Sequence, residues 1–106
     1  MNRIILSKNI KGTILDIGGG GEGIIGRSYK TQVTAIDNRQ EELDEAPEGF
    51  TKLLMDACDL KFSDSTFDNV TFFYTLMYIE NEKHRKALEE AYRVLKDGGY
   101  LGCRYK

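Results

Sequence analysis

Apolar residues occur along the chain in short runs, separated by polar stretches. The first run, Thr13–Ile17, is β-branched and ends at a string of glycines, as expected for a buried strand that enters a tight turn. Two further runs of strand length, Gln32–Ile36 and Thr51–Met55, are each followed by an aspartate. The most aromatic run is Phe67–Tyr74. Its near-continuous apolar character predicts a strand buried on both faces, beside the first strand at the centre of a sheet.

Helical stretches separate these runs. Glu22–Tyr29 begins with an acidic residue, which suits a helix N-terminus, and Glu41–Ala46 is a brief helical candidate that ends before a proline. A longer helix is predicted from Asn81, a candidate N-cap, to a stop at Lys96–Gly99. Its apolar positions recur at helical spacing and are Ala87, Leu88, Ala91, Tyr92 and Leu95. A fifth strand is predicted over Tyr100–Tyr105.

Strands that alternate with helices indicate βαβ units. Their right-handed crossovers give a parallel sheet with helices on both faces, and we predict one such domain over residues 1–106. Ligands of these sheets bind outside the carboxyl ends of the strands. Those ends carry Asp16 with the glycine run, Asp37, Asp56 and Tyr74, so the functional site is expected there.

Composition narrows the class of protein. With 41% hydrophobic and 30% charged residues and one proline, the chain is typical of globular proteins. The net charge of −2 comes from interspersed residues, so nothing indicates the basic stripe of a nucleic-acid partner. Cys58 and Cys103 lack a CxxC partner or a histidine cluster, which predicts reduced thiols and no metal site. Without a signal peptide or membrane-span pattern, we expect a cytoplasmic protein with no membrane partner.

The glycine run contains a nucleotide-binding pattern. Gly18, Gly20 and Gly23 match GxGxxG, in which glycine permits the turn and lets a ligand approach the backbone. An ordinary glycine-rich turn would show the same pattern. Asp37 adds support because a carboxylate at the end of the second strand can accept hydrogen bonds from both ribose hydroxyls of an adenosine. The alternative role for Asp37 is a solvated helix cap.

Two further carboxylates indicate the kind of nucleotide. Asp56 follows the third strand, where it could accept a hydrogen bond from the exocyclic amine of adenine, although a role in a turn is the alternative. Asp16 precedes the first glycine. A carboxylate there suits a positively charged group and would repel a pyrophosphate. The combination favours a ligand with sulfonium and amino-acid groups over a dinucleotide.

These residues form a recognisable set of motifs. The segment Ile14–Gly20 resembles the first motif of class I S-adenosylmethionine-dependent methyltransferases, Phe67–Val70 resembles the start of their fourth strand, and Glu89–Leu101 resembles their last helix, glycine turn and fifth strand. The resemblance runs from about residue 11 to residue 105 and is greatest to the branch that methylates small molecules. It implies a Rossmann-like three-layer α/β sandwich with a mainly parallel sheet of about five strands in the order 3-2-1-4-5.

The resemblance also implies residue roles. Asp37 would bind the ribose, Asp56 would contact adenine, and Gly18 and Gly20 would face the methionine moiety. The candidate S-adenosylmethionine-binding residues are Asp16, Gly18, Gly19, Gly20, Asp37, Asn38, Asp56, Ala57 and Tyr74. No catalytic side chain is assigned, because displacement at a sulfonium methyl can be accelerated by positioning alone. His84, the single histidine, is expected to be a solvated helix residue.

The sequence departs from the family pattern in two places. Glu22 stands where the last glycine of the loop is usual, which could shift the loop by one residue. The sequence also lacks the usual continuation after the fifth strand, a helix and an antiparallel strand pair. We therefore expect a fragment, or a domain that a partner completes, such as a second copy bound at the exposed edge of the fifth strand.

The predicted function is transfer of a methyl group from S-adenosylmethionine to a small-molecule acceptor. A non-catalytic module or partner subunit that binds S-adenosylmethionine or S-adenosylhomocysteine is the alternative. An NAD-binding oxidoreductase fragment would also explain GxGxxG with Asp37. Asp16 argues against the oxidoreductase alternative, because the charge of its carboxylate would repel the pyrophosphate.

Overall fold

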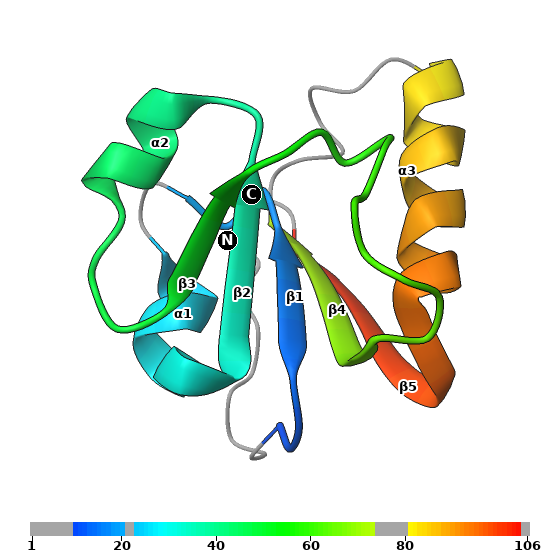
Figure 1. The fold of residues 1–106 in the computed structure, drawn as a ribbon, viewed down its shortest axis with the longest axis horizontal. Helices are drawn as coiled ribbons and strands as arrows, with labels where there is room; N and C mark the ends of the chain where they lie inside the picture. Colours follow the sequence, from blue (N-terminus) through cyan, green and yellow to red (C-terminus); the bar gives the residue numbers. More distant parts are fainter. Residues whose placement is uncertain (1–9, 21–22, 74–80, 105–106) are drawn as a thin grey trace.

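The chain folds into a parallel sheet whose two faces are covered by helices (Figure 1). The computed structural model describes residues 10–20, 23–73 and 81–104. In chain order the elements are β1 (Ile14–Ile17), α1 (Ile24–Tyr29), the 3-10 helix η1 (Lys30–Gln32), β2 (Val33–Asp37), α2 (Gln40–Glu45), β3 (Thr51–Leu54), β4 (Phe67–Phe73), α3 (Asn81–Val94) and β5 (Leu95–Arg104).

The strand order is β3-β2-β1-β4-β5, and every neighbouring pair is parallel. This confirms the predicted fold class and the central position of β1 beside β4. At the middle of the sheet, Asp16 of β1 pairs with Ala35 of β2 and with Thr71 of β4. All the carboxyl ends therefore lie at one edge, seen in Figure 1 as the arrowheads.

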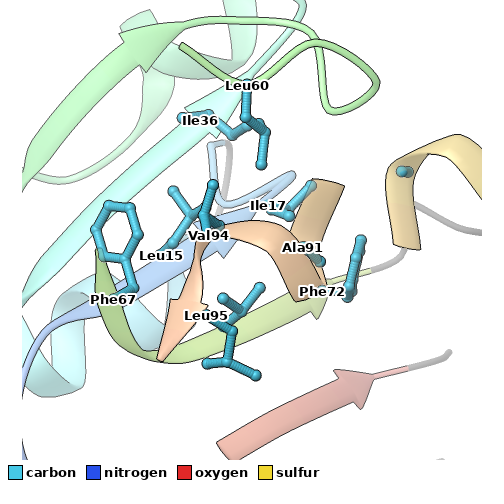
Figure 2. Packing of buried hydrophobic residues seen from close by; sticks show 11 residues of the cluster. Leu15, Ile17, Ile36, Leu60, Phe67, Phe72, Ala91, Val94 and Leu95 are labelled. Atoms are coloured by element: carbon cyan, nitrogen blue, oxygen red, sulfur yellow. The ribbon is translucent and has the colours of Figure 1, made fainter. Parts of the chain in front are cut away.

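Side chains alternate between the two faces of the sheet and form two hydrophobic clusters. On one face, Leu15 and Ile17 belong to a cluster with Ala91 and Val94 of α3. Figure 2 shows these side chains with Leu60, which comes from the segment between β3 and β4. On the other face the cluster consists of Ile14, Ile25, Val33 and Ala35, and it joins α1 to β1 and β2. Burial of both faces explains the near-continuous apolar runs of the central strands.

The junction between α3 and β5 differs from the prediction. The helix ends at Val94, and Leu95 already belongs to β5 and pairs with Phe67. Tyr92, expected on the apolar stripe, has 63% of its surface exposed, whereas the polar Glu90 is buried. The predicted stop at residues 96–99 is an irregularity within β5, because the pairing of β4 with β5 shifts register there. The face of the helix that packs against the sheet contains Ala87, Ala91 and Val94, and Tyr92 does not belong to it.

The other predicted boundaries agree with the structure to within one or two residues where the chain is described. β2 extends to Asp37, β3 ends at Leu54, and α2 spans Gln40–Glu45. The described part of α1 begins at Ile24, after the segment 21–22, which lies outside the described residues. Tyr74 also lies outside them, so the prediction for it stays a prediction.

Asp68 joins the amino ends of three strands. Its Oδ2 accepts hydrogen bonds from the backbone N–H of Thr13 at 2.8 Å and from the Thr13 hydroxyl at 3.1 Å. Its Oδ1 lies 3.2 Å from Nζ of Lys96. These interactions, led by the Thr13 N–H, hold the pKa of the Asp68 carboxyl below its ordinary value. The carboxylate occupies the space where a side chain on Gly12, with φ of +88°, would lie.

Candidate functional site

The glycine turn after β1 is attached to the end of β2. The N–H groups of Gly18 and Gly19 both donate to the carbonyl oxygen of Ile36, at 2.8 and 3.2 Å. Gly18 has φ of +78°, in the left-handed region that residues with a side chain rarely adopt. The turn therefore lies directly beside the carboxyl end of β2, as predicted for a site outside the strand ends.

Packing of the turn explains three of its glycines. A side chain on Gly19 would collide with the carboxylate of Asp16, and a Cβ on Gly20 would lie 3.0 Å from the backbone of Glu42 in α2. A Cβ on Gly23, with φ of +61°, would lie 2.8 Å from Cδ of Pro47. These positions require glycine for close contact with the rest of the protein, independently of any contact with a ligand.

Asp16 lies beneath the glycine turn. Its side chain is only 1% exposed, and its Oδ1 accepts a hydrogen bond of 2.7 Å from the hydroxyl of Thr71. Both residues project from neighbouring positions on the same face of the sheet. The structure thus places the Asp16 carboxylate directly beneath the glycine turn, in the space that a side chain on Gly19 would occupy.

Asp37 ends β2 and is partly exposed. Its Oδ1 accepts a hydrogen bond of 3.1 Å from the N–H of Arg39, two residues further on, and Asn38 between them is exposed. The Asp37 carbonyl oxygen accepts a bond of 3.0 Å from the N–H of Met55, immediately after β3. This bond brings the chain that follows β3 to the side of Asp37.

Asp56 begins a turn at that point and is exposed. Its Oδ1 accepts a hydrogen bond of 2.8 Å from the N–H of Cys58, and its carbonyl oxygen accepts one of 3.0 Å from the N–H of Asp59. Ala57 is partly buried. The Cys58 thiol donates to the carbonyl oxygen of Lys83 in α3 at 3.3 Å. Burial raises the pKa of this thiol, and the nearby Asp56 carboxylate raises it further.

The arrangement offers hydrogen-bond acceptors at neighbouring strand ends. The bonds that close the two turns use Oδ1 of Asp37 and Oδ1 of Asp56, and Oδ2 of each carboxylate takes no part in them. Carboxylate oxygens at such positions suit ligands that present hydroxyl or amine donors, and adenosine presents both. His84 is partly buried on α3. Among the described residues, no three His, Cys, Asp or Glu side chains are grouped as a metal site requires.

No helix in the described part of the chain is both long and apolar enough to cross a membrane.

The sequence analysis did not identify three residues near this site. Thr71 holds Asp16, and Glu90 and Arg93 of α3 bind the segment after Asp56. Thr71 is a polar residue within the apolar β4 run, and Glu90 lies between apolar helix positions. A polar residue at a buried position needs a partner, which is a signal in the sequence, but the partner itself could not be named from it.

Comparisons with known proteins agree with this geometry. A family model described as a methyltransferase domain matches residues 15–103. The ubiquinone/menaquinone biosynthesis C-methyltransferase of Desulfotalea psychrophila is 39% identical over 101 residues, covering 87% of this chain and 40% of that protein. The demethylmenaquinone methyltransferase of Protochlamydia amoebophila is 30% identical over 114 residues, with 92% and 46% covered.

A solved SAM-dependent methyltransferase from Methanosarcina mazei superposes with a TM-score of 0.76 at 28% identity, covering 87% of this chain and 52% of that one. The chain spans less than half the length of the two curated relatives. Because the family model covers most of its residues, the chain belongs to the methyltransferase domain family.

Proposed function

We propose that the chain is the S-adenosylmethionine-binding core of a methyltransferase that acts on a small molecule. Membership of the methyltransferase domain family supports the reaction class. The two curated relatives are named for ubiquinone/menaquinone biosynthesis and for demethylmenaquinone, which supports a small acceptor. The observation that carries the cofactor assignment is the placement of two carboxylates, Asp37 and Asp56, at neighbouring strand ends beside a glycine turn.

Each carboxylate matches a different part of the cofactor. Asp37, at the end of β2, would accept hydrogen bonds from the ribose hydroxyls, and Asp56 would accept one from the exocyclic amine of adenine. The negative charge of buried Asp16, beneath Gly19, favours the positively charged methionine part. Asn38 and Ala57, next to these carboxylates, and Tyr74 complete the proposed set. When bound, S-adenosylmethionine supplies an electrophilic methyl group, and the role of the chain is to hold and orient it.

Calorimetric titration of the chain with S-adenosylmethionine, S-adenosylhomocysteine and NAD tests the cofactor assignment. We expect the first two to bind and NAD not to bind. Asp37→Asn should weaken S-adenosylhomocysteine binding by roughly tenfold or more, because a hydrogen bond to a charged group is worth about 1.5–3 kcal/mol. Asp44→Asn is the matched control, since Asp44 is an exposed carboxylate on α2 whose Oδ1 accepts a hydrogen bond from Gln40 of the same helix. Binding of NAD alone would contradict the proposal.

Methyl transfer is tested separately. Incubation with S-adenosylmethionine and a demethylated quinol should produce S-adenosylhomocysteine and a methylated quinol if the chain is catalytically active. Binding of the cofactor without transfer to any small acceptor would favour the alternative, a non-catalytic binding module. The two measurements therefore distinguish an enzyme from a binding protein.

A further inference from the structure

Glu90 and Arg93 of α3 bind the segment that connects β3 to β4. Oε1 of Glu90 accepts a hydrogen bond of 2.8 Å from the N–H of Leu60. The Arg93 guanidinium donates to the carbonyl oxygens of Leu60 and Phe62, each at 2.9 Å, and to the Asp64 carboxylate at 2.8 Å. One residue of the segment, Leu60, thus has both its N–H and its C=O bound by α3.

The two side chains also bind each other. Nε of Arg93 lies 2.8 Å from Oε2 of Glu90, and Nη2 donates to Oε1 at 3.2 Å. The Glu90 side chain is only 10% exposed and that of Arg93 is 33% exposed, so the pair is far better shielded from water than an ordinary surface ion pair. The hydrogen bonds from Arg93 and Leu60 lower the pKa of the Glu90 carboxyl in spite of its burial. The pair is therefore charged and rigidly placed.

The segment that this pair binds starts at the candidate adenine-binding residue. The turn at Asp56 is closed by the N–H groups of Cys58 and Asp59, and Leu60 follows directly. The Cys58 thiol adds a bond to Lys83 of α3. The Leu60 side chain is 4% exposed within the core cluster shown in Figure 2. The segment is therefore attached to α3 directly after the Asp56 turn.

We propose that Glu90 and Arg93 are positioning residues that hold the Asp56 carboxylate in place to recognise the exocyclic amine of adenine. They act through the backbone of Leu60 and do not touch the ligand. The inference rests on the proposed function, because it presupposes that Asp56 binds adenine. In Figure 1 the segment after β3 crosses the strand ends toward α3. Through its bonds to Leu60, the helix therefore supports the side of the site that contains Asp56.

The test compares two ligands that differ at one group of the base. One is S-adenosylhomocysteine, and the other is its inosine analogue, in which a carbonyl oxygen replaces the exocyclic amine. We expect the wild-type chain to prefer the adenine ligand by roughly tenfold or more. Asp56→Asn should abolish this preference. Arg93→Lys, which keeps the charge but loses the planar fork, and Glu90→Gln should each reduce the preference at least threefold, or about 0.65 kcal/mol.

A matched control separates positioning from a general loss of stability. Asp68→Asn disrupts a carboxylate–cation pair at the opposite end of β4, so it destabilises the domain without reaching the Asp56 turn. We expect this variant to keep the wild-type preference for adenine. Equal losses of preference in Asp68→Asn and in Arg93→Lys would overturn the inference.

The remaining outcomes are also decisive. Circular dichroism first establishes which variants fold. If Arg93→Lys does not fold, Glu90→Gln decides the test, because it keeps the size of the side chain and removes the charge that binds the Arg93 guanidinium. An unchanged preference in these variants, or no preference in the wild type, overturns the inference. If the wild-type chain binds neither ligand, it is the proposed function that fails.

Discussion

The hydrogen bond between Thr71 and Asp16 is the most direct link between the fold and the candidate site, and Thr71→Val tests it. Valine has nearly the shape of threonine but no hydroxyl. Thr71 is 1% exposed, as is Asp16, and the bond between them is 2.7 Å long. The substitution therefore removes one donor from a buried carboxylate without opening a cavity.

The expected loss of stability follows from two opposing contributions. A hydrogen bond to a charged group contributes about 1.5–3 kcal/mol. The additional methyl group of valine recovers up to about 0.8 kcal/mol by burial. We expect the free energy of unfolding to fall by about 1–2 kcal/mol. In a domain of this size each kcal/mol lowers Tm by roughly 4–8 °C.

Urea denaturation and thermal unfolding measure this loss, with Thr71→Ser as the control that retains the hydroxyl. A double-mutant cycle with Asp16→Asn isolates the interaction. The effect of Thr71→Val should be clearly smaller in the Asp16→Asn background, because the asparagine carries no charge. A change of less than 0.5 kcal/mol on Thr71→Val, or the same change in both backgrounds, would refute the reasoning.

Three other predictions concern the fold. Gly26→Ala should lower the free energy of unfolding by about 1–2 kcal/mol, because a Cβ there collides with the Phe50 ring and overpacking outweighs the gain in helix propensity. A smaller loss of stability in the double variant Gly26→Ala/Phe50→Leu would confirm this cause, whereas a Gly26→Ala variant more stable than the wild type would contradict it. Phe72→Ala, at a 1% exposed core position, should cost about 3–5 kcal/mol in urea denaturation, and a loss below 1 kcal/mol would contradict the assigned core. The pKa of the Asp68 carboxyl is lowered in the folded state, chiefly by the hydrogen bond from the Thr13 N–H. Its contribution to stability is therefore complete above the ordinary aspartate pKa of about 4 and declines as pH falls through the lower folded pKa. The thermal stabilities of the wild type and of Asp68→Asn should converge toward acid pH, and a difference that stays constant with pH would argue against the prediction.

The sequence by itself determined the fold and the positions of the candidate carboxylates. Runs of apolar residues alternating with helical stretches predict a parallel α/β sheet, because the periodicity of each element depends on neighbours in the chain. The positions of Asp37 and Asp56 follow from this, since Asp37 is the last residue of β2 and Asp56 lies in the turn just after β3. The glycine turn was equally visible, because left-handed backbone at Gly18 favours glycine locally.

Only the tertiary structure decided which residues meet across the fold. Thr71 and Asp16 are far apart in the sequence and become neighbours through the register of β1 with β4. The outward position of Tyr92 depends on how α3 is rotated against the sheet, and helical spacing alone allows more than one face. Likewise, the attachment of Leu60 to Arg93 arises from where the chain crosses the strand ends. Local patterns specify the elements, whereas contacts between distant residues exist only once those elements have packed together.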